Sequence, residues 1–266
     1  MKLNRLAILI KGAGEMASGI AWRLHKGGFK NIVMLEIAAP MAVRRTVSFS
    51  ECVYDGTKAV DGVMAVHAAT APEIDRALTE GKIAVVIDPE WQTIEDRRPD
   101  VVIDAIIAKK NLGTRMDEAD LVIGLGPGFC AGSDVHVVIE TNRGPNCGRV
   151  MYQGCPEKNT GIPGTVMGID VDRVVRATAT GNFIPFVHLN DRVEAGAVLG
   201  AVNGVPVLAR VDGLVRGLIR AEIFVKEGVK IGDIEPRDNV DNSLVSDKSL
   251  GLGGAVLEAI LSRYNV

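Results

Sequence analysis

The chain has 266 residues, of which 47% are hydrophobic and 24% charged, and its formal net charge is -3. This length suffices for one large domain or two smaller ones, and the apolar content excludes a disordered chain. A weakly acidic chain lacks the positive field that holds a phosphate backbone, so no nucleic-acid partner is expected. No apolar run approaches the ~20 residues of a membrane span, and the N-terminus lacks a signal-peptide pattern, which together predict a cytoplasmic protein without a membrane partner.

Short β-branched runs alternate with helical patterns between residues 6 and 124. Continuous apolar strands separated by helices are typical of a parallel sheet that is covered on both faces. Helices are expected at about residues 15–26 and 71–81. The sequence therefore predicts an α/β, Rossmann-like parallel sheet domain over residues 1–168.

The sharpest local pattern is Gly12-Ala13-Gly14-Glu15-Met16-Ala17, between an apolar strand and a helix. In dinucleotide-binding domains the first Gly makes a tight turn, the second lets a pyrophosphate approach the backbone, and a small third residue allows close packing. Glu36 ends the next strand, where a carboxylate can hold ribose hydroxyls. We therefore expect Gly12, Gly14, Ala17 and Glu36 to bind NAD(P) or another nucleotide. The alternative is a Gly-rich turn that packs without a ligand beside a solvated Glu36.

Two further carboxylates are expected at strand ends, because Asp88 closes the run IAVVID and Asp104 closes VVID. Ligands bind open α/β sheets outside the carboxyl ends of the strands, so these residues are also candidates for cofactor binding. They can equally cap the helices that follow. We favour capping over a metal site, because no His accompanies the acids at ligand spacing. No metal is predicted.

Residues 124–168 lose the α/β rhythm and become rich in Gly, Pro and polar residues. The candidate cofactor-binding residues here are Gly126, Gly128, Asp134, Glu140 and Arg143. The glycines free a run of backbone N–H groups that can hold an anion. Asp134 and Glu140 can accept from a pterin or purine, and Arg143 can donate to a phosphate. The alternative is a hairpin region whose glycines only make turns, with Glu140 and Arg143 as a surface ion pair.

The four cysteines, Cys52, Cys130, Cys147 and Cys155, are too few and too scattered for a disulfide scaffold, and no pair has Cys-x-x-Cys spacing. This pattern favours a reducing cytosol. Cys130 lies in the Gly-rich loop and Cys155 in a turn-rich segment, but neither has an obvious base beside it in the sequence. Their role stays open.

The following segment is β only and contains an internal repeat, in which residues 189–202 (LNDRVEAGAVLGAV) match residues 221–234 (AEIFVKEGVKIGDI). The repeated V-x-x-G-x-x-L/I-G resembles the biotinyl and lipoyl carrier domains. The resemblance implies a small barrel-sandwich module over residues 169–238. Its hairpin tip reads Asn203-Gly204, a type I′ turn signal without a Lys for attachment. Residues 239–266 are expected to form a tail and a helix.

Phrases spread over the whole chain include IKGAGEMASGIAWRL, VVIDAIIAKKN, DVHVVIET, NTGIPG and the closing SDKSLGLGGAVLEAIL. Together they resemble the selenium-dependent molybdenum hydroxylase maturation proteins of the YqeB type, which are related in role to the xanthine dehydrogenase accessory factors. The resemblance implies an accessory factor that binds molybdenum cofactor, or molybdopterin, and prepares it for insertion into a molybdenum hydroxylase. Asp134, Glu140 and Arg143 suit such an anionic pterin.

A second class of function stays open, namely a NAD(P)-dependent oxidoreductase of unknown substrate. The two classes share a small-molecule partner but differ in whether the chain is an enzyme. The sequence decides neither this question nor the selenium donor, the identity of the cofactor or self-association.

Overall fold

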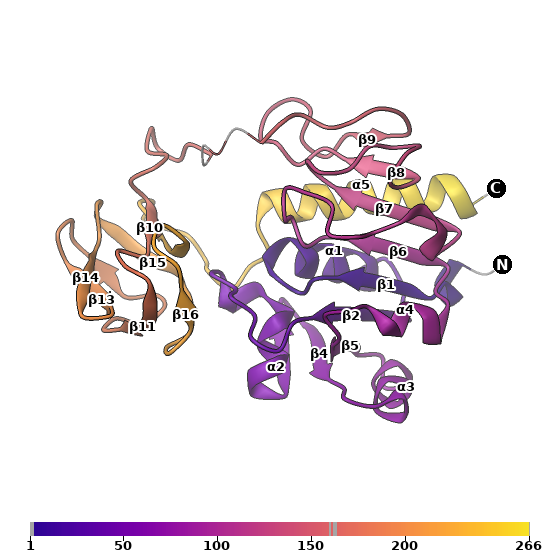
Figure 1. Ribbon diagram of the computed structural model, residues 1–266, viewed down its shortest axis with the longest axis horizontal. Helices are drawn as coiled ribbons and strands as arrows, with labels where there is room; N and C mark the ends of the chain where they lie inside the picture. Colours follow the sequence, from indigo (N-terminus) through magenta and orange to yellow (C-terminus); the bar gives the residue numbers. More distant parts are fainter. Residues whose placement is uncertain (1–2, 160, 162–163, 266) are drawn as a thin grey trace. The chain divides into compact units, whose positions relative to one another are not determined.

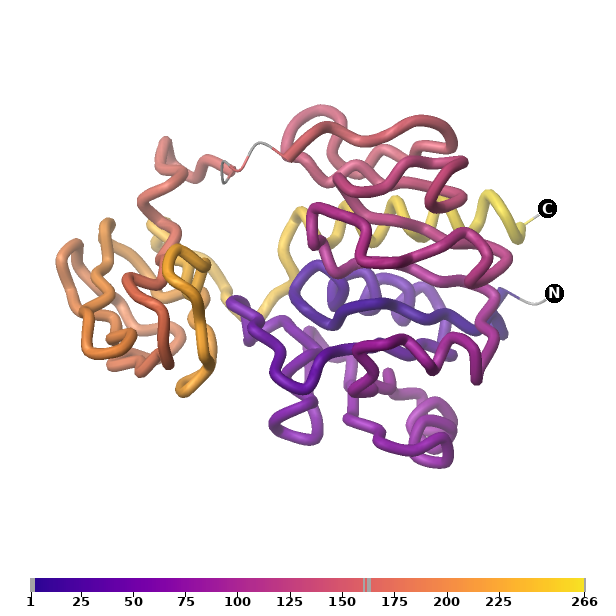
Figure 2. Tube along the Cα trace, viewed as in Figure 1, coloured from indigo at the N-terminus to yellow at the C-terminus, as the bar shows by residue number. Residues whose placement is uncertain are grey.

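The computed structural model describes residues 3–159, 161 and 164–265, which form two compact units (Figures 1 and 2). Unit 1 comprises Met1–Pro40, Val47–Asn159 and Val245–Val266, and unit 2 comprises Met41–Thr46 and Thr160–Leu244. The last two passages of the chain between the units lie between residues 159 and 160 and between residues 244 and 245. The C-terminal helix returns to unit 1.

Unit 1 is built on a nine-stranded sheet in the order β3-β4-β5-β2-β1-β6-β7-β8-β9. The strands are β1 (Ile8–Lys11), β2 (Ile32–Glu36), β3 (Thr57–Val60), β4 (Val63–His67), β5 (Ile83–Ile87), β6 (Val101–Asp104), β7 (Leu121–Leu125), β8 (Val137–Ile139) and β9 (Val150–Met151). The seven inner strands are parallel, whereas β3 and β9 pair antiparallel at the two edges. The inner strands read as unbroken apolar runs because both faces of the sheet are buried.

Three helices cover one face of this sheet (Figure 1). The α-helices of unit 1 are α1 (Glu15–Lys26), α2 (Cys52–Asp55), α3 (Ala71–Thr79), α4 (Gln92–Arg97) and α5 (Asp247–Tyr264). α1 packs over β1 and β4, and α5 packs over β7, β8 and β9. The other face is covered by side chains from α3, α4 and the loop after β7, among them Ile74, Ile94 and Phe129.

Glycines let α1 and α5 approach each other closely. A Cβ atom at Gly19 would clash with the side chain of Ser249, and one at Gly253 would lie 2.7 Å from the Cβ of Arg23. Because Gly19 faces Ser249 and Arg23 faces Gly253, the contact advances in the same direction along both helices. The two helices are therefore parallel, and both begin at the edge of the sheet where the parallel strands end.

The Rossmann-like expectation is wrong, because the sheet is mixed and carries an antiparallel strand at each edge. The described residues 105–120, which connect β6 to β7, contain a 3-10 helix (Met116–Glu118) but no α-helix. An apolar strand indicates that both faces of its sheet are buried, but it does not indicate whether helices or loops cover those faces. A long loop rather than an α-helix connects β6 to β7 and covers part of the sheet, so unit 1 is a mixed α/β structure with a large, mainly parallel sheet.

Unit 2 consists of two four-stranded antiparallel sheets, in the orders β10-β17-β15-β12 and β14-β13-β11-β16. Its strands are β10 (Val174–Arg176), β11 (Gly181–Pro185), β12 (Arg192–Val193), β13 (Val198–Val202), β14 (Val205–Leu208), β15 (Gly213–Leu218), β16 (Phe224–Val225) and β17 (Lys230–Glu235). The expectation of a biotinyl/lipoyl-like barrel-sandwich module is wrong, because these strands form two separate sheets. Each copy of the repeat supplies one strand to each sheet, as β12 with β13 and β16 with β17. The repeat thus specified pairs of strands but not the module that they build.

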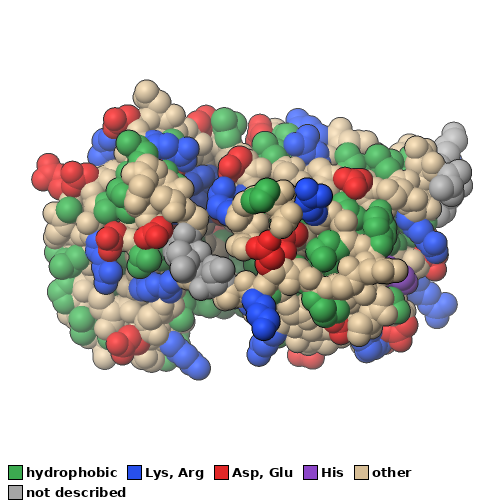
Figure 3. All heavy atoms as spheres, turned by 90° about the horizontal axis from the view of Figure 1, so that it is seen from above, with side chains coloured by type: hydrophobic (Ala, Val, Ile, Leu, Met, Phe, Trp, Pro, Cys, Tyr) green, Lys and Arg blue, Asp and Glu red, His purple; other side chains and the backbone are tan. Residues whose placement is uncertain are grey.

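None of the helices in the described part of the chain is long and apolar enough to cross a membrane. Basic, acidic and hydrophobic side chains are interspersed on the face drawn in Figure 3. Neither sign of charge dominates that face, in keeping with the small net charge of -3.

We expect Gly19→Ala to lower the free energy of unfolding by about 1–3 kcal/mol, because the new methyl group overpacks the contact with Ser249. The matched control is Gly254→Ala, a helical glycine of α5 where an added Cβ meets no atom within 4 Å. The control should be neutral or stabilising by up to about 1 kcal/mol, because Ala favours helix more than Gly does. Urea-induced unfolding measures both. Equal stability of the two variants would show that α1 and α5 do not meet at Gly19.

Candidate functional site

The connection between β1 and α1 consists of Gly12, Ala13 and Gly14. Gly12 has a φ of +90°, and a Cβ there would lie 3.3 Å from the Cα of Ile106. Gly14 is the N-cap residue of α1; no side chain caps the helix, and the space beside Gly14 is open. Ala17 is fully buried in the first turn of the helix. The uncapped N–H groups and the positive end of the helix dipole suit an anion.

Glu36, at the end of β2, holds this connection in place. Its Oε2 accepts from the Ala13 N–H at 2.9 Å, and its Oε1 accepts from the Ile37 N–H at 2.8 Å. Burial raises the pKa of Glu36, although both hydrogen bonds lower it. A ribose would have to share these oxygens with the protein's own amides.

Asp88 and Asp104 also bond to donors of the protein. Asp88 accepts from two backbone N–H groups in the first turn of α4, at 3.1 and 2.7 Å, and so caps that helix. Asp104 is 3% exposed and accepts from the Thr114 hydroxyl at 2.7 Å and from the Ile106 N–H at 3.2 Å. Across the described ranges, no three or more His, Cys, Asp or Glu side chains are grouped so that they could hold a metal ion.

The sequence analysis did not single out Lys11, the last residue of β1, which is fully buried. Its Nζ donates to the Thr114 hydroxyl at 2.8 Å and lies 2.7 Å from the Oε2 of Glu118. The same Nζ lies 3.6 Å from the ring centroid of Trp91. Burial lowers the pKa of Lys11, and Glu118 opposes this effect. The available signal was a charged residue at the end of an otherwise apolar inner strand.

A cleft of about 760 Å³ adjoins this cluster. Trp91 and Glu118 belong to its wall and also contact Lys11. The remaining wall includes Glu90, Glu95, Arg98, Arg115, Asp117 and Asp120. None of these residues was a candidate in the sequence analysis.

The Gly-rich loop after β7 packs closely against its surroundings. A Cβ at Gly126 would clash with the Thr141 side chain, and one at Gly128 would lie 2.5 Å from the Cα of Lys110. Asp134 accepts from a backbone N–H of the same loop at 2.8 Å. In the structure, Gly126 and Gly128 therefore allow close packing of the loop, and Asp134 stabilises its turn. Anion binding by this loop stays a prediction.

Glu140 and Arg143 do not form the surface ion pair that was the alternative reading. Glu140 is 2% exposed, and its carboxylate accepts from the backbone N–H groups of Asn142 at 2.6 Å and Glu157 at 2.7 Å. Arg143 is exposed and lies 3.4 Å from the carboxylate of Asp247, at the start of α5. Glu140 therefore joins the backbone at Asn142 to the backbone at Glu157, while Arg143 lies beside the N-terminus of α5.

Lys248, in the first turn of α5, was also missed. Burial lowers its pKa, Cys147 raises it and Arg143 lowers it, while Glu15 and Glu140 raise it. The hydroxyl of the next residue, Ser249, lies 3.7 Å from the sulfur of Met16 in the first turn of α1, so Lys248 is near the start of that helix. It has no hydrogen-bond or ion-pair partner among the residues that the structure describes. A cation in the first turn of a helix is unfavourable, because it lies at the positive end of the helix dipole. The lysine of the phrase SDKS, just before the predicted helix, could therefore have pointed to this residue.

We call the N-termini of α1 and α5, together with Lys248 and Arg143, the helix-end site. The two helices are parallel and begin at the same edge of the sheet. The positive ends of their dipoles and the two cationic side chains therefore contribute to one local positive field. Glu15 and Asp247 lie in the same first turns and reduce this positive field. The arrangement suits an anionic group.

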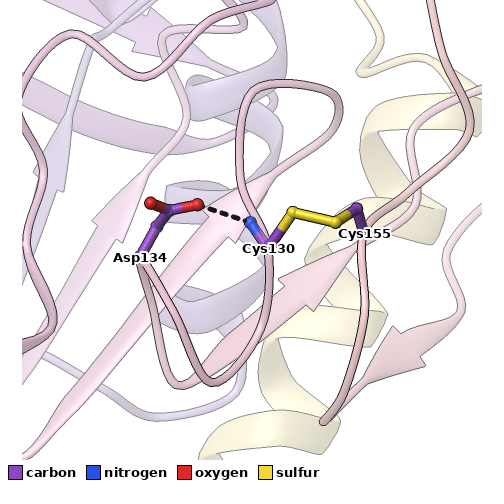
Figure 4. The surroundings of a disulfide bond; sticks show 3 residues. All are labelled: Cys130, Asp134 and Cys155. Atoms are coloured by element: carbon purple, nitrogen blue, oxygen red, sulfur yellow. Dashed lines mark hydrogen bonds between the residues drawn. A yellow bond between two sulfur atoms is a disulfide. The ribbon is translucent and has the colours of Figure 1, made fainter.

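Cys130 and Cys155 form a disulfide (Figure 4). Their sequence separation is 25, but Ala131 and Gly154 form an antiparallel bridge that brings the two loops together. The sequence analysis left the role of these two cysteines open, because only the tertiary structure joins residues that are so distant in sequence. The other two cysteines, Cys52 and Cys147, are free thiols.

Over 255 residues, or 96% of its length, the chain is 46% identical to the uncharacterized protein YqeB of Escherichia coli strain K12. The match covers 47% of YqeB, so the chain spans about half the length of this curated relative. The YqeB-type resemblance is thereby confirmed, while a role in selenium or molybdenum chemistry is not addressed. No family model matches the chain.

The solved structures that resemble this chain do so weakly. The protein TcdA (CsdL) is 14% identical, with 99% of this chain and 90% of that chain covered and a TM-score of 0.36. An aspartoacylase family protein of Mesorhizobium loti MAFF303099 is 12% identical, with 78% and 57% covered and a TM-score of 0.26. Likeness at this level says nothing of what this chain does.

We expect Lys11→Met to lower the free energy of unfolding by about 3–5 kcal/mol, because it leaves the buried Glu118 carboxylate without its cation. Changing Glu118 to Gln in the same chain should restore part of the loss. The control is Lys82→Met, whose pair with Glu80 is open to solvent and should contribute little to stability. Urea-induced unfolding separates these cases, and a loss no larger than that of the control would contradict the buried pair.

Asp104 makes the free energy of unfolding depend on pH. Burial raises the pKa of Asp104 from its ordinary value, so the folded state holds this proton more tightly than the unfolded state does. Its contribution to stability is fully present below the unfolded pKa and is lost as the pH rises through the raised folded pKa. Asp104→Asn should therefore flatten the decline of the unfolding free energy in this range.

The control for this measurement is Asp117→Asn, because the Asp117 side chain is exposed. It should leave the pH profile unchanged. Parallel profiles of the wild type and Asp104→Asn would show that Asp104 is not responsible for the decline.

Proposed function

From a likeness to YqeB that covers 96% of this chain and 47% of YqeB, we propose that this chain is an accessory factor that binds an anionic cofactor, a nucleotide or a molybdopterin, at the helix-end site. The observation that carries the proposal is the half-buried, unpartnered Lys248 beside the uncapped start of α1. Service to a selenium-dependent molybdenum hydroxylase is proposed from the sequence resemblance alone.

The electrostatics of the helix-end site favour a phosphate. Each helix N-terminus carries about half a positive charge, and a lysine in the first turn costs roughly 0.3–1 kcal/mol against that dipole. Partial burial of Lys248 adds a desolvation cost, because no carboxylate neutralises the ammonium directly. A bound phosphate offsets both costs. Arg143 can turn toward the same phosphate, since its exposed contact with Asp247 is weak.

Pterin recognition through Asp134 and Glu140 is not part of this proposal, because both carboxylates bond to loop amides. No observation favours the alternative, a NAD(P)-dependent oxidoreductase. Its ribose contact would fall on Glu36, whose two oxygens accept from the N–H groups of Ala13 and Ile37. The proposal therefore rests on the phosphate end of the cofactor.

We expect Lys248→Met and Arg143→Ala each to weaken binding of a phosphate-bearing ligand by about 1.5–3 kcal/mol, the worth of a charge-assisted hydrogen bond. Isothermal titration with pyrophosphate, ADP, NADP and molybdopterin measures the effect and ranks the classes of cofactor. Folding should be retained, because Lys248→Met removes a cation from the positive end of a helix.

The control is Arg76→Ala, an exposed arginine of α3 that pairs with Glu80. It should leave every affinity unchanged. If Lys248→Met and Arg143→Ala bind all four ligands as the wild type does, or if the wild type binds none, the proposal fails.

A further inference from the structure

The Cys130–Cys155 disulfide joins two loops of unit 1 (Figure 4). Cys130 is half-buried in the loop after β7, whereas Cys155 is exposed in the segment after β9. An external thiol that reaches this bond therefore meets the sulfur of Cys155 first. Attack there would release Cys130 as the leaving thiolate.

Hydrogen bonds within the first loop, and one between the two loops, are independent of the disulfide. The Cys130 N–H donates to the Asp134 carboxylate at 2.8 Å, as Figure 4 shows, and the Asp134 N–H donates back to the Cys130 carbonyl at 3.0 Å. The Ala131 N–H donates to the Gly154 carbonyl at 2.8 Å. Opening of the disulfide is therefore expected to have a local effect and to leave the fold of unit 1 intact.

The segment that carries Cys155 also clamps a neighbouring turn. Two residues further on, the Glu157 N–H donates to the Glu140 carboxylate at 2.7 Å. The Glu157 carboxylate accepts from the side-chain amides of Asn142 at 2.5 Å and Asn146 at 2.9 Å. The clamped turn, residues 142–147, carries Arg143 and Cys147 of the surroundings of Lys248. The disulfide is thus connected through Glu157 to the helix-end site.

We propose that Cys130 and Cys155 are a reversible dithiol–disulfide pair that exchanges with an external dithiol, and that its opening loosens the turn of residues 142–147. One thiolate of the dithiol attacks the Sγ of Cys155, the S–S bond breaks, and Cys130 leaves as a thiolate with the electron pair. The second thiolate of the dithiol attacks the mixed disulfide and releases the Cys155 thiolate. The dithiol is oxidised to a cyclic disulfide, while the protein pair gains two electrons and two protons.

The exchange is tested on the native chain in buffers that step through the ratio of reduced to oxidised dithiothreitol. Alkylation with a maleimide, followed by mass spectrometry, identifies the reduced cysteines. Cys130 and Cys155 should become labelled together in one two-electron transition, with an unchanged far-ultraviolet circular dichroism spectrum. Labelling that requires denaturation, or labelling of both residues at every ratio, would overturn the proposal.

Cys130→Ser and Cys155→Ser should each abolish the transition, whereas Cys52→Ser, a change at a buried free thiol, should keep it. The coupling to the turn rests on the proposed function and is measured by pyrophosphate affinity before and after reduction of the wild type. Reduction should weaken binding by about fivefold, a typical coupling between two sites. Equal affinities would refute the coupling. Absence of binding in both states would refute the proposed function and leave the redox transition standing.

Discussion

The close parallel packing of α1 against α5 is the constraint on which the rest of unit 1 depends. Gly19 and Gly253 leave out the Cβ atoms that would collide with Ser249 and Arg23, so the helices share one face of the sheet. α5 comes from the far end of the sequence, beyond unit 2, and begins beside the start of α1. A distant segment thereby supplies half of the helix-end site.

The opposite face depends on a buried polar cluster. Lys11 binds Thr114 and Glu118 at a place where an apolar residue would fit the pattern of the strand. These contacts fix a loop over the sheet where a helix would ordinarily lie. Each partner compensates the burial of the other, so the loop is specified by charge as well as by apolar contact.

The sequence pattern correctly placed the candidate carboxylates next to strands, but it assigned them to a ligand, whereas the structure pairs them with the protein's own backbone. Glu36 is the last residue of β2, and Asp88, Asp134 and Glu140 lie in loops next to strands. Each accepts hydrogen bonds from backbone N–H groups of the protein itself. Lys248, a cation without such an internal partner among the described residues, lies in a segment whose sequence pattern predicted only an apolar helix.

The sequence by itself determined the apolar inner strands, the turn at Gly12–Gly14 and the repeated strand pairs, because these depend on local periodicity and on backbone freedom. It also carried the likeness to YqeB. Only the tertiary structure decided the antiparallel edges, the loop over Lys11, the union of Cys130 with Cys155 and the position of Lys248 beside α1. Each of these joins residues far apart in the chain, and such contacts follow from how whole elements pack rather than from any local pattern.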